Sequence, residues 1–210
     1  MTEQNYITSY CKINANAVFI NGDESFINKE HLNKVDFLKS AYKHYEISYP
    51  KFYKMDSLCK LAFVASELLM KTNKLTDSYN KEDIAIIISN SASSLETDTE
   101  HQKTIQETTN FFPSPAVFVY TLPNILIGEI AIRNTIQGEN TFFIFDKFDG
   151  DFNVSYINTL LNTNKAKSCI AGWVDFYEEN MEAFLFTVEK NTNKKTIEFN
   201  DEQLTKLYNN

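Results

Sequence analysis

Apolar positions along the chain follow two spacings, one helical and one strand-like. The clearest helical signal is Met55–Lys71, where aliphatic residues recur every three or four positions behind Asp56, a residue type that caps helix N-termini. The block Ile84–Ser89 is continuously apolar and of strand length, which is typical of a strand covered on both faces of a sheet. These two segments predict a helix packed against a buried sheet.

The remaining segments repeat this alternation of strand and helix. Right-handed crossovers turn such an order into parallel strands with helices on both faces. The pattern therefore predicts an α/β fold with α/β/α layers and a mostly parallel mixed sheet. Gly138 is expected to terminate the helix before it. Further strands are predicted in Tyr6–Ile20 (one strand, or a hairpin around Asn14–Asn16), Thr141–Asp146 (as a buried strand), Ser168–Asp175 and Ala183–Glu189. Helices are predicted in Leu32–Tyr45, Leu95–Thr109, Asn124–Ile136, Asn200–Leu207 and, after the loop Lys147–Asp151, in an amphipathic segment that carries Val154, Ile157, Leu160 and Leu161.

Composition narrows the class of protein. The chain has 210 residues, 43% of them hydrophobic, and a formal charge of −8 with lysines scattered among acidic residues. A nucleic-acid binder needs a concentrated basic face, so none is expected here. No linker, repeat or change of composition interrupts the chain, and residues 1–210 are predicted to form one domain.

Cysteine usage and hydropathy indicate a cytoplasmic protein. Cys11, Cys59 and Cys169 are odd in number and lack paired spacing, which favours free thiols over disulfides. No apolar run is long enough to span a membrane, and the first twenty residues do not resemble a secretory signal.

Motifs for common chemistry are missing. The five glycines match neither a dinucleotide fingerprint nor a P-loop, and no Cys and His residues have zinc-ligand spacing, so no cofactor or metal is expected. The serine-rich segment Asn90–Ser94 lacks the G-x-S-x-G pattern of a serine nucleophile and is interpreted as a polar turn. Each cysteine falls within a predicted helix or strand, where a small buried hydrophobe is the commoner role.

Several stretches, in matching order, resemble one enzyme family. Ile87–Asp98 (IISNSASSLETD) is similar to the family's strand and turn GTGLGSLETD, and Ser114–Asn124 resembles SP..F..TLPN. Gly138–Asn140 stands where the family has GPN, and Cys169–Asp175 resembles ALVGGVD. The chain thus resembles the N-terminal half of the β-ketoacyl synthases, condensing enzymes of fatty-acid and polyketide synthesis with the thiolase fold.

This resemblance also shows departures from the family. In active members of the family, the strand that follows GPN leads into a turn that carries a nucleophilic cysteine. This cysteine lies at the N-terminus of a helix, whose dipole favours the thiolate. The matching positions here are Lys147, Phe148 and Asp149, and no cysteine lies within Glu139–Lys167. The histidines and lysine that assist decarboxylation in the family belong to a second half of the fold. The departures imply a pseudoenzyme with no catalytic residue.

The resemblance implies a dimer interface as well. The family's equivalent of the segment Thr141–Asp146 pairs antiparallel with its mate across a dimer, so the candidate interface consists of Thr141, Phe142, Phe143, Ile144, Phe145 and Asp146. Phenylalanines here and at positions 111, 112 and 118 suit an apolar interface or tunnel wall, although such aromatic residues are more often core.

Three functional hypotheses remain open. The first is a compact subunit, similar to a chain length factor, that forms a heterodimer with an active ketosynthase, in fatty-acid or polyketide synthesis such as an aryl-polyene or flexirubin-type pigment pathway. Acyl carrier protein is a further possible partner, and a homodimer is the alternative for the isolated chain. The second is a small acyl-transfer or condensing enzyme with a displaced nucleophile, Cys169. The third is a module that binds acyl carrier protein or acyl chains, for which the chain's negative charge is unfavourable.

Overall fold

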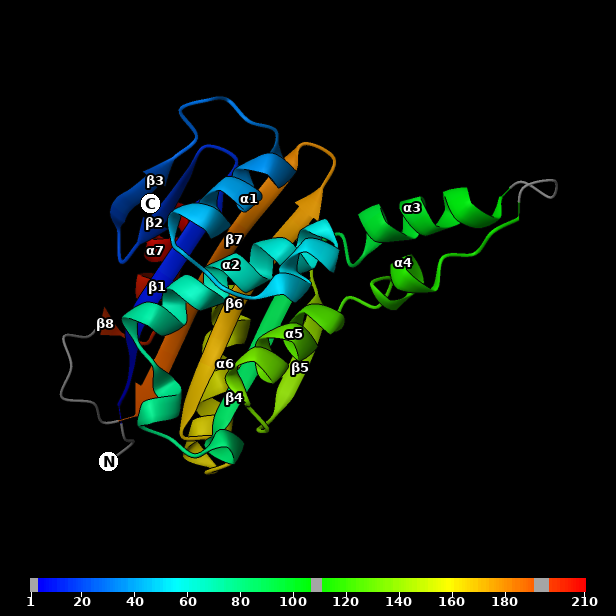
Figure 1. The fold of residues 1–210 in the computed structure, drawn as a ribbon. Coiled ribbons are helices and arrows are strands. Elements are labelled where there is room, and N and C mark those ends of the chain that lie inside the picture. The colour runs from blue at the N-terminus through cyan, green and yellow to red at the C-terminus, as the bar shows by residue number, and fades with distance from the viewer. Residues whose placement is uncertain (1–3, 107–110, 191–196) are drawn as a thin grey trace.

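An eight-stranded sheet forms the centre of the molecule (Figure 1). The computed structural model describes residues 4–106, 111–190 and 197–210. Seven strands follow one another in the order β3-β2-β1-β7-β6-β4-β5, and β8 pairs with β1. Their bounds are β1 Asn5–Asn14, β2 Ala17–Ile20, β3 Asp23–Ile27, β4 Ile84–Asn90, β5 Asn140–Ile144, β6 Ser168–Tyr177, β7 Asn180–Lys190 and β8 Ile197–Glu198.

Helices cover both faces of the sheet. On one face α1 (Lys34–His44), α2 (Ser57–Thr72) and α5 (Ile125–Asn134) enclose one apolar core. On the other, α6 (Gly150–Asn162) and α7 (Asp201–Asn209) enclose a second. Two more helices, α3 (Leu95–Ile105) and α4 (Pro115–Val119), extend away from the body (Figure 1). The predicted α/β class and its layers are confirmed.

The sheet contains fewer parallel pairs than predicted. Only β4–β5 and β4–β6 are parallel among the described strands, whereas β1, β2, β3 and β7 join antiparallel neighbours. The reason lies in the connections, because β1–β2 and β6–β7 are joined by short turns that only an antiparallel hairpin can use. The sheet is mixed, but the description as mostly parallel was wrong.

The central helix and strand agree with their predictions. Asp56 is the N-cap of α2, and its carboxylate accepts a 2.9 Å hydrogen bond from the Cys59 amide. All seven residues of β4 are buried. Most of this helix and the whole of this strand are buried, as their apolar patterns require.

The end of α5 differs from the prediction. The helix ends at Thr135, which adopts the left-handed conformation (φ 56°) and caps the last turn. Gly138 is needed for a different reason, because a Cβ there would lie 2.2 Å from the carbonyl oxygen of Ile84. Close approach to β4, rather than helix termination, explains this glycine.

Two further segments depart from expectation. Strand β5 lies at the edge of the sheet and is half-buried to exposed, so it is not the buried strand expected for Thr141–Asp146. The helix predicted for Leu95–Thr109 corresponds to α3, while residues 107–110 lie outside the described residues. Strand β3 was not predicted, since Asp23–Ile27 is largely polar.

Candidate functional site

The turn between β5 and α6 holds the three positions at which the family resemblance implies a nucleophile. Lys147 is exposed, Phe148 is buried (8% exposed) and Asp149 is exposed at the N-cap of α6. The Asp149 carboxylate accepts a 2.8 Å hydrogen bond from the Phe152 amide. A carboxylate thus already occupies the favourable field at this helix N-terminus. It can cap the helix, but it supplies no thiolate.

Helix α7 packs over this turn. The Phe148 ring stacks on Tyr208, with centroids 4.3 Å apart, and meets Phe184 edge-on at 5.6 Å. A Cβ added to Gly150 would lie 2.4 Å from Oδ1 of Asp201, which shows how closely α7 approaches the first turn of α6. Phe148 therefore fills a closed apolar site rather than lining an open pocket.

Tyr208 is anchored in this closed position. Its hydroxyl donates a 2.8 Å hydrogen bond to the Glu182 carboxylate, and its carbonyl oxygen accepts from the Lys12 ammonium at 2.5 Å. Burial, followed by the Glu182 carboxylate, raises the pKa of Tyr208 above its usual range. The Tyr208 hydroxyl therefore stays protonated at physiological pH. One hydrogen bond holds its side chain and another holds its backbone, so the ring is kept in place over Phe148.

The three thiols are buried and unsuited to nucleophilic attack. Burial raises the pKa of Cys11 to about 12, and it also raises the pKa of Cys169. The pKa of Cys59 is raised first by burial and then by the Asp56 carboxylate. A nucleophile requires an accessible thiol with a lowered pKa. The structure therefore disfavours the hypothesis of a displaced nucleophile at Cys169, which is completely buried.

The serine-rich segment Asn90–Ser94 is a structural turn, as interpreted from the sequence. Buried Asp175 accepts hydrogen bonds from the Ser91 hydroxyl (2.8 Å) and amide (3.2 Å), the Ala92 amide (3.2 Å) and the Asn180 side chain (2.9 Å). These bonds satisfy the carboxylate and fix the turn after β4.

The six residues of the predicted interface lie along β5 and the bend that follows it. Side chains alternate between the two faces of the sheet, so Phe142 packs with the core under α5 and Phe143 and Phe145 pack with the core under α6. Ile144 is 56% exposed, Asp146 is exposed and Thr141 is half-buried. On the α6 side, Phe143 and Phe145 form a partly exposed aromatic cluster with Phe152 and Tyr156.

Exposed apolar side chains are concentrated near β5 and on the projecting segment. We call residues 95–124, except the undescribed 107–110, the arm (Figure 1). Phe111, Phe112 and Phe118 are 61%, 79% and 56% exposed, so the commoner assignment of such residues to the core is wrong here. Val119 and Leu122 on the arm and Ile132 on α5 are also exposed. Patches of this kind commonly mark interaction surfaces.

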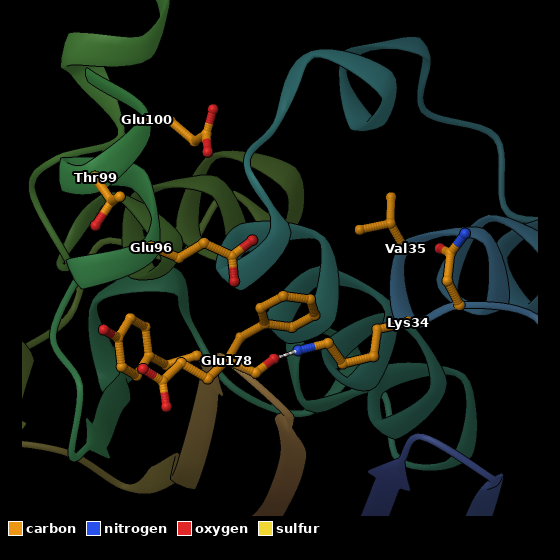
Figure 2. A pocket seen from close by; sticks show the side chains of 9 residues that line it. Lys34, Val35, Glu96, Thr99, Glu100 and Glu178 are labelled. Atoms are coloured by element: carbon orange, nitrogen blue, oxygen red, sulfur yellow. Dashed lines mark hydrogen bonds between the residues drawn. The ribbon is translucent and has the colours of Figure 1, made fainter. Parts of the chain in front are cut away.

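A separate cavity of about 490 Å³ lies between α1, α3 and the β6–β7 hairpin (Figure 2). The Lys34 ammonium crosses it, donates to the carbonyl oxygen of Glu178 and lies 4.5 Å from the centroid of the Phe176 ring. Glu96 projects into the cavity from α3, and burial raises the pKa of its carboxyl. None of the predicted site residues lines this cavity.

The described residues contain neither a membrane-spanning helix nor a cluster of metal ligands. No helix among them is long and apolar enough to cross a membrane. Within residues 4–106, 111–190 and 197–210, no three His, Cys, Asp or Glu side chains come together in a way that could hold a metal ion.

Comparison with solved structures reveals what this arrangement resembles. The ishigamide ketosynthase/chain length factor matches with a TM-score of 0.65 and 15% identity over 92% of this chain. The fold is ketosynthase-like. A type II polyketide synthase ketosynthase in complex with its acyl-carrier protein (AntDE:AntF) matches with a TM-score of 0.62 and 14% identity over 91% of the chain. In both cases the chain spans 64% of the other protein's length.

A third ketosynthase-like match is a complex from Xenorhabdus doucetiae, in which the ketosynthase ApeO is bound to its chain length factor ApeC. The TM-score is 0.56, with 11% identity, and the match covers 90% of this chain and 80% of the other. No family model and no curated protein sequence matches the chain. At these identities the likeness extends to the fold alone.

Proposed function

We propose that this chain is a non-catalytic ketosynthase-like subunit that pairs with an active β-ketoacyl synthase. The observation that carries this proposal is the closed turn between β5 and α6. A condensing enzyme must present a thiolate to an acyl donor. Here Asp149 caps the helix, and Phe148 is packed under Tyr208. An acyl thioester cannot form on either side chain.

A partner subunit accounts for the exposed apolar surface. The arm and the β5 edge together expose several large apolar side chains, including Phe112 (79%) and Ile144 (56%). Leaving such side chains in water forgoes about 1.5–3 kcal/mol each relative to full burial. Two of the solved neighbours are described as a ketosynthase with a chain length factor. The same kind of assembly would bury the arm and β5 in this protein.

The proposed pathway is fatty-acid or polyketide synthesis, with aryl-polyene or flexirubin-type pigments as the narrower possibility. One solved neighbour is a ketosynthase in complex with an acyl-carrier protein, and we propose a carrier protein as a second partner of the assembled complex. A carrier protein is acidic, and this chain carries a charge of −8, so its docking site would lie mainly on the ketosynthase.

Co-expression with an active β-ketoacyl synthase from the same organism tests the proposal. A tag on the ketosynthase should retain this chain in a one-to-one complex, and condensing activity should fall when the chain is omitted. The control is Ile27→Lys on the opposite edge of the sheet, which should be retained like the wild type. Separate elution of the two proteins, with unchanged condensing activity, would overturn the proposal.

A second experiment tests whether this chain lacks condensing-enzyme chemistry, that is, whether it forms no acyl-enzyme adduct. After incubation with acyl and malonyl thioesters, intact mass spectrometry of this chain should show no acyl adduct. The matched variant Phe148→Cys should also remain unmodified, because α7 covers that position. An acylated peptide from the wild-type chain would establish an enzyme instead.

A further inference from the structure

The cavity of about 490 Å³ beside α3 lies at the carboxyl ends of two parallel strands, β4 and β6. We call this space, bounded by Lys34, Glu96 and Phe176, the α3 cavity. Strand β6 reaches its wall at Phe176 and Tyr177, and the turn after β4 leads into α3, which contributes Glu96. Ligands of open α/β sheets commonly bind outside the carboxyl ends of parallel strands, in pockets of this size.

The lining of the α3 cavity carries an excess of negative charge. Glu96, Glu100 and Glu178 contribute three carboxylates, against the single ammonium group of Lys34 among the described lining residues. Figure 2 shows Lys34 and Glu96 reaching into the cavity from opposite sides, from α1 and α3. The Lys34 ammonium donates to the backbone carbonyl oxygens of Glu178 and Asn180. It is therefore bonded to the hairpin backbone rather than to a carboxylate of the cavity.

Glu96 is the carboxylate of this lining that would gain most from a counterion. Its side chain is half-buried, and burial raises the pKa of its carboxyl. The Ser57 hydroxyl and then the charge of Lys34 lower this pKa, but by less than burial raises it. Asp56 and Glu100 add like charges nearby. A cation beside Glu96 would offset the desolvation of its carboxylate.

The wall of the cavity suits a cation with an apolar body. Phe176 and Tyr177 are aromatic, and Val35 adds an aliphatic surface. The Lys34 ammonium already lies 4.5 Å from the centroid of the Phe176 ring, so the protein itself places a cation at this wall. Aromatic rings attract cations more strongly where water is excluded, and proteins recognise organic ammonium groups in this way.

We propose that the α3 cavity binds a small organic cation, with an ammonium or guanidinium group on a short apolar body. The charged group would lie beside Glu96, and the body would lie along Val35 and the aromatic wall. The surplus of carboxylates disfavours anions. A bare metal ion is disfavoured as well, because no group of three metal-ligating side chains converges anywhere in the described part of the chain. The site is separate from β5, so this inference goes beyond the proposed pairing.

A second cavity, of about 340 Å³, is a weaker candidate for the same ligand. It shares Glu96 and Glu100 with the α3 cavity and adds Asp56, but Lys54 and Lys60 also line it. Two lysines nearly balance its three carboxylates, which leaves less attraction for a cation. Lys34 lines the α3 cavity and not this one, so a variant of Lys34 distinguishes the two sites.

A ligand in the α3 cavity would tie the base of the arm to the body. Near the start of α3, the Thr97 hydroxyl donates a 2.8 Å hydrogen bond to the Asp56 carboxylate at the N-cap of α2. A cation between Glu96 and the β6–β7 hairpin would add a second link on the other side of the cavity. The amides of α3 should then exchange more slowly with solvent when the ligand is bound.

Benzylamine is a suitable probe, because it joins one ammonium group to one aromatic ring. Titration into the isotope-labelled full chain should give saturable shifts of the amide resonances of Glu96, Thr99 and Tyr177. A dissociation constant of about 1 mM is expected for so small a molecule. Benzyl alcohol, which is neutral, and phenylacetate, which is an anion, should each bind at least about tenfold more weakly. Equal binding of the three compounds, or no saturable shift with benzylamine, would overturn the proposal.

Two charge variants should change the affinity in opposite directions. Glu96→Gln keeps the shape of the side chain and should raise the dissociation constant of benzylamine about tenfold. Lys34→Gln removes the competing cation of the α3 cavity and should lower that constant about threefold. The control Glu202→Gln removes an exposed carboxylate on α7 and should leave the constant unchanged. The amide spectrum of each variant verifies that it is folded.

Two further results would contradict the assignment. Equal losses in Glu96→Gln and Glu202→Gln would mean a general attraction of cations to an acidic protein. Shifts centred on Lys54 and Tyr120, with no response to Lys34→Gln, would place the ligand in the second cavity. The titration uses this chain alone, so its outcome is independent of the proposed pairing with a ketosynthase.

Discussion

The two edges of the sheet differ in how readily a further strand can pair with them. At one edge, β3 carries Asp23 and Glu24, both exposed, and a shift of register interrupts its pairing with β2. Charges and bulges are the usual protection of a free edge. At the other edge, β5 pairs with β4 in continuous register and has no charged residue or proline within it. The difference indicates that only the β5 edge is suited to pairing.

The largest expected effect concerns the packing behind each edge. Phe148→Ala should lower the free energy of unfolding by about 4 kcal/mol, because it opens a cavity beneath Tyr208 in a closed site. Phe26→Ala on β3 should lower it by about 2 kcal/mol, because Phe26 is only half-buried. Urea unfolding measures both, and equal losses would contradict the closed turn described for the β5 side.

Proline substitutions distinguish the two sides of β5 itself. The Phe145 amide donates to the Asn90 carbonyl oxygen of β4, and successive residues point to opposite sides, so odd-numbered residues face β4 and even-numbered ones face outward. Phe143→Pro removes an amide that faces β4 and should cost about 3 kcal/mol of unfolding free energy. Ile144→Pro removes an outward amide and should cost less than about 1 kcal/mol while weakening association of the chain. The two variants are compared by urea unfolding and sedimentation. The orientation of β5 is wrong if Ile144→Pro is the more destabilising.

A lysine at each edge compares them directly. Ile144→Lys should weaken pairing about 100-fold, because the interface would bury an ammonium group without a partner. Ile27→Lys, at a residue 39% exposed on β3, should leave pairing unchanged. Affinity for the ketosynthase is the readout. A comparable loss in both variants would show that the edges do not differ as described.

The smallest expected effect is at the helix cap. Asp149→Ala removes the side-chain acceptor for the Phe152 amide and should cost about 1 kcal/mol, whereas Asp149→Asn should cost little because asparagine caps equally well. Thermal unfolding resolves this difference. A gain in stability for the alanine variant would mean that Asp149 is not the cap of α6.

Local patterns predicted the parts of the fold that depend on local chemistry. The N-cap at Asp56 and the buried strand around Ile84–Ser89 follow from residue type and spacing, and the structure contains both. The polar β3 strand had no such signal, because its pairing with β2 supplies the order that its own sequence lacks. The antiparallel hairpin between β6 and β7 is implicit in the sequence, because too few residues separate the two strands for a parallel crossover.

The candidate site was less predictable than the fold. Aromatic residues such as Phe112 have the composition of a core, and no local pattern distinguishes them from exposed residues on an arm. The cover over Phe148 depends on Tyr208, which is remote in sequence and comes near only through the fold. The edge position of β5 likewise depends on the strand order rather than on its own residues.

Amide hydrogen exchange along β5 in the presence of the active ketosynthase tests the central claim most directly. The reference is Ile144→Lys, in which the edge should remain unpaired. The account predicts that the outward amides of Phe142 and Ile144 become protected in the wild-type complex, while the amides of β3 exchange as before. A complex that forms with these two amides exchanging as fast as in the reference would contradict it.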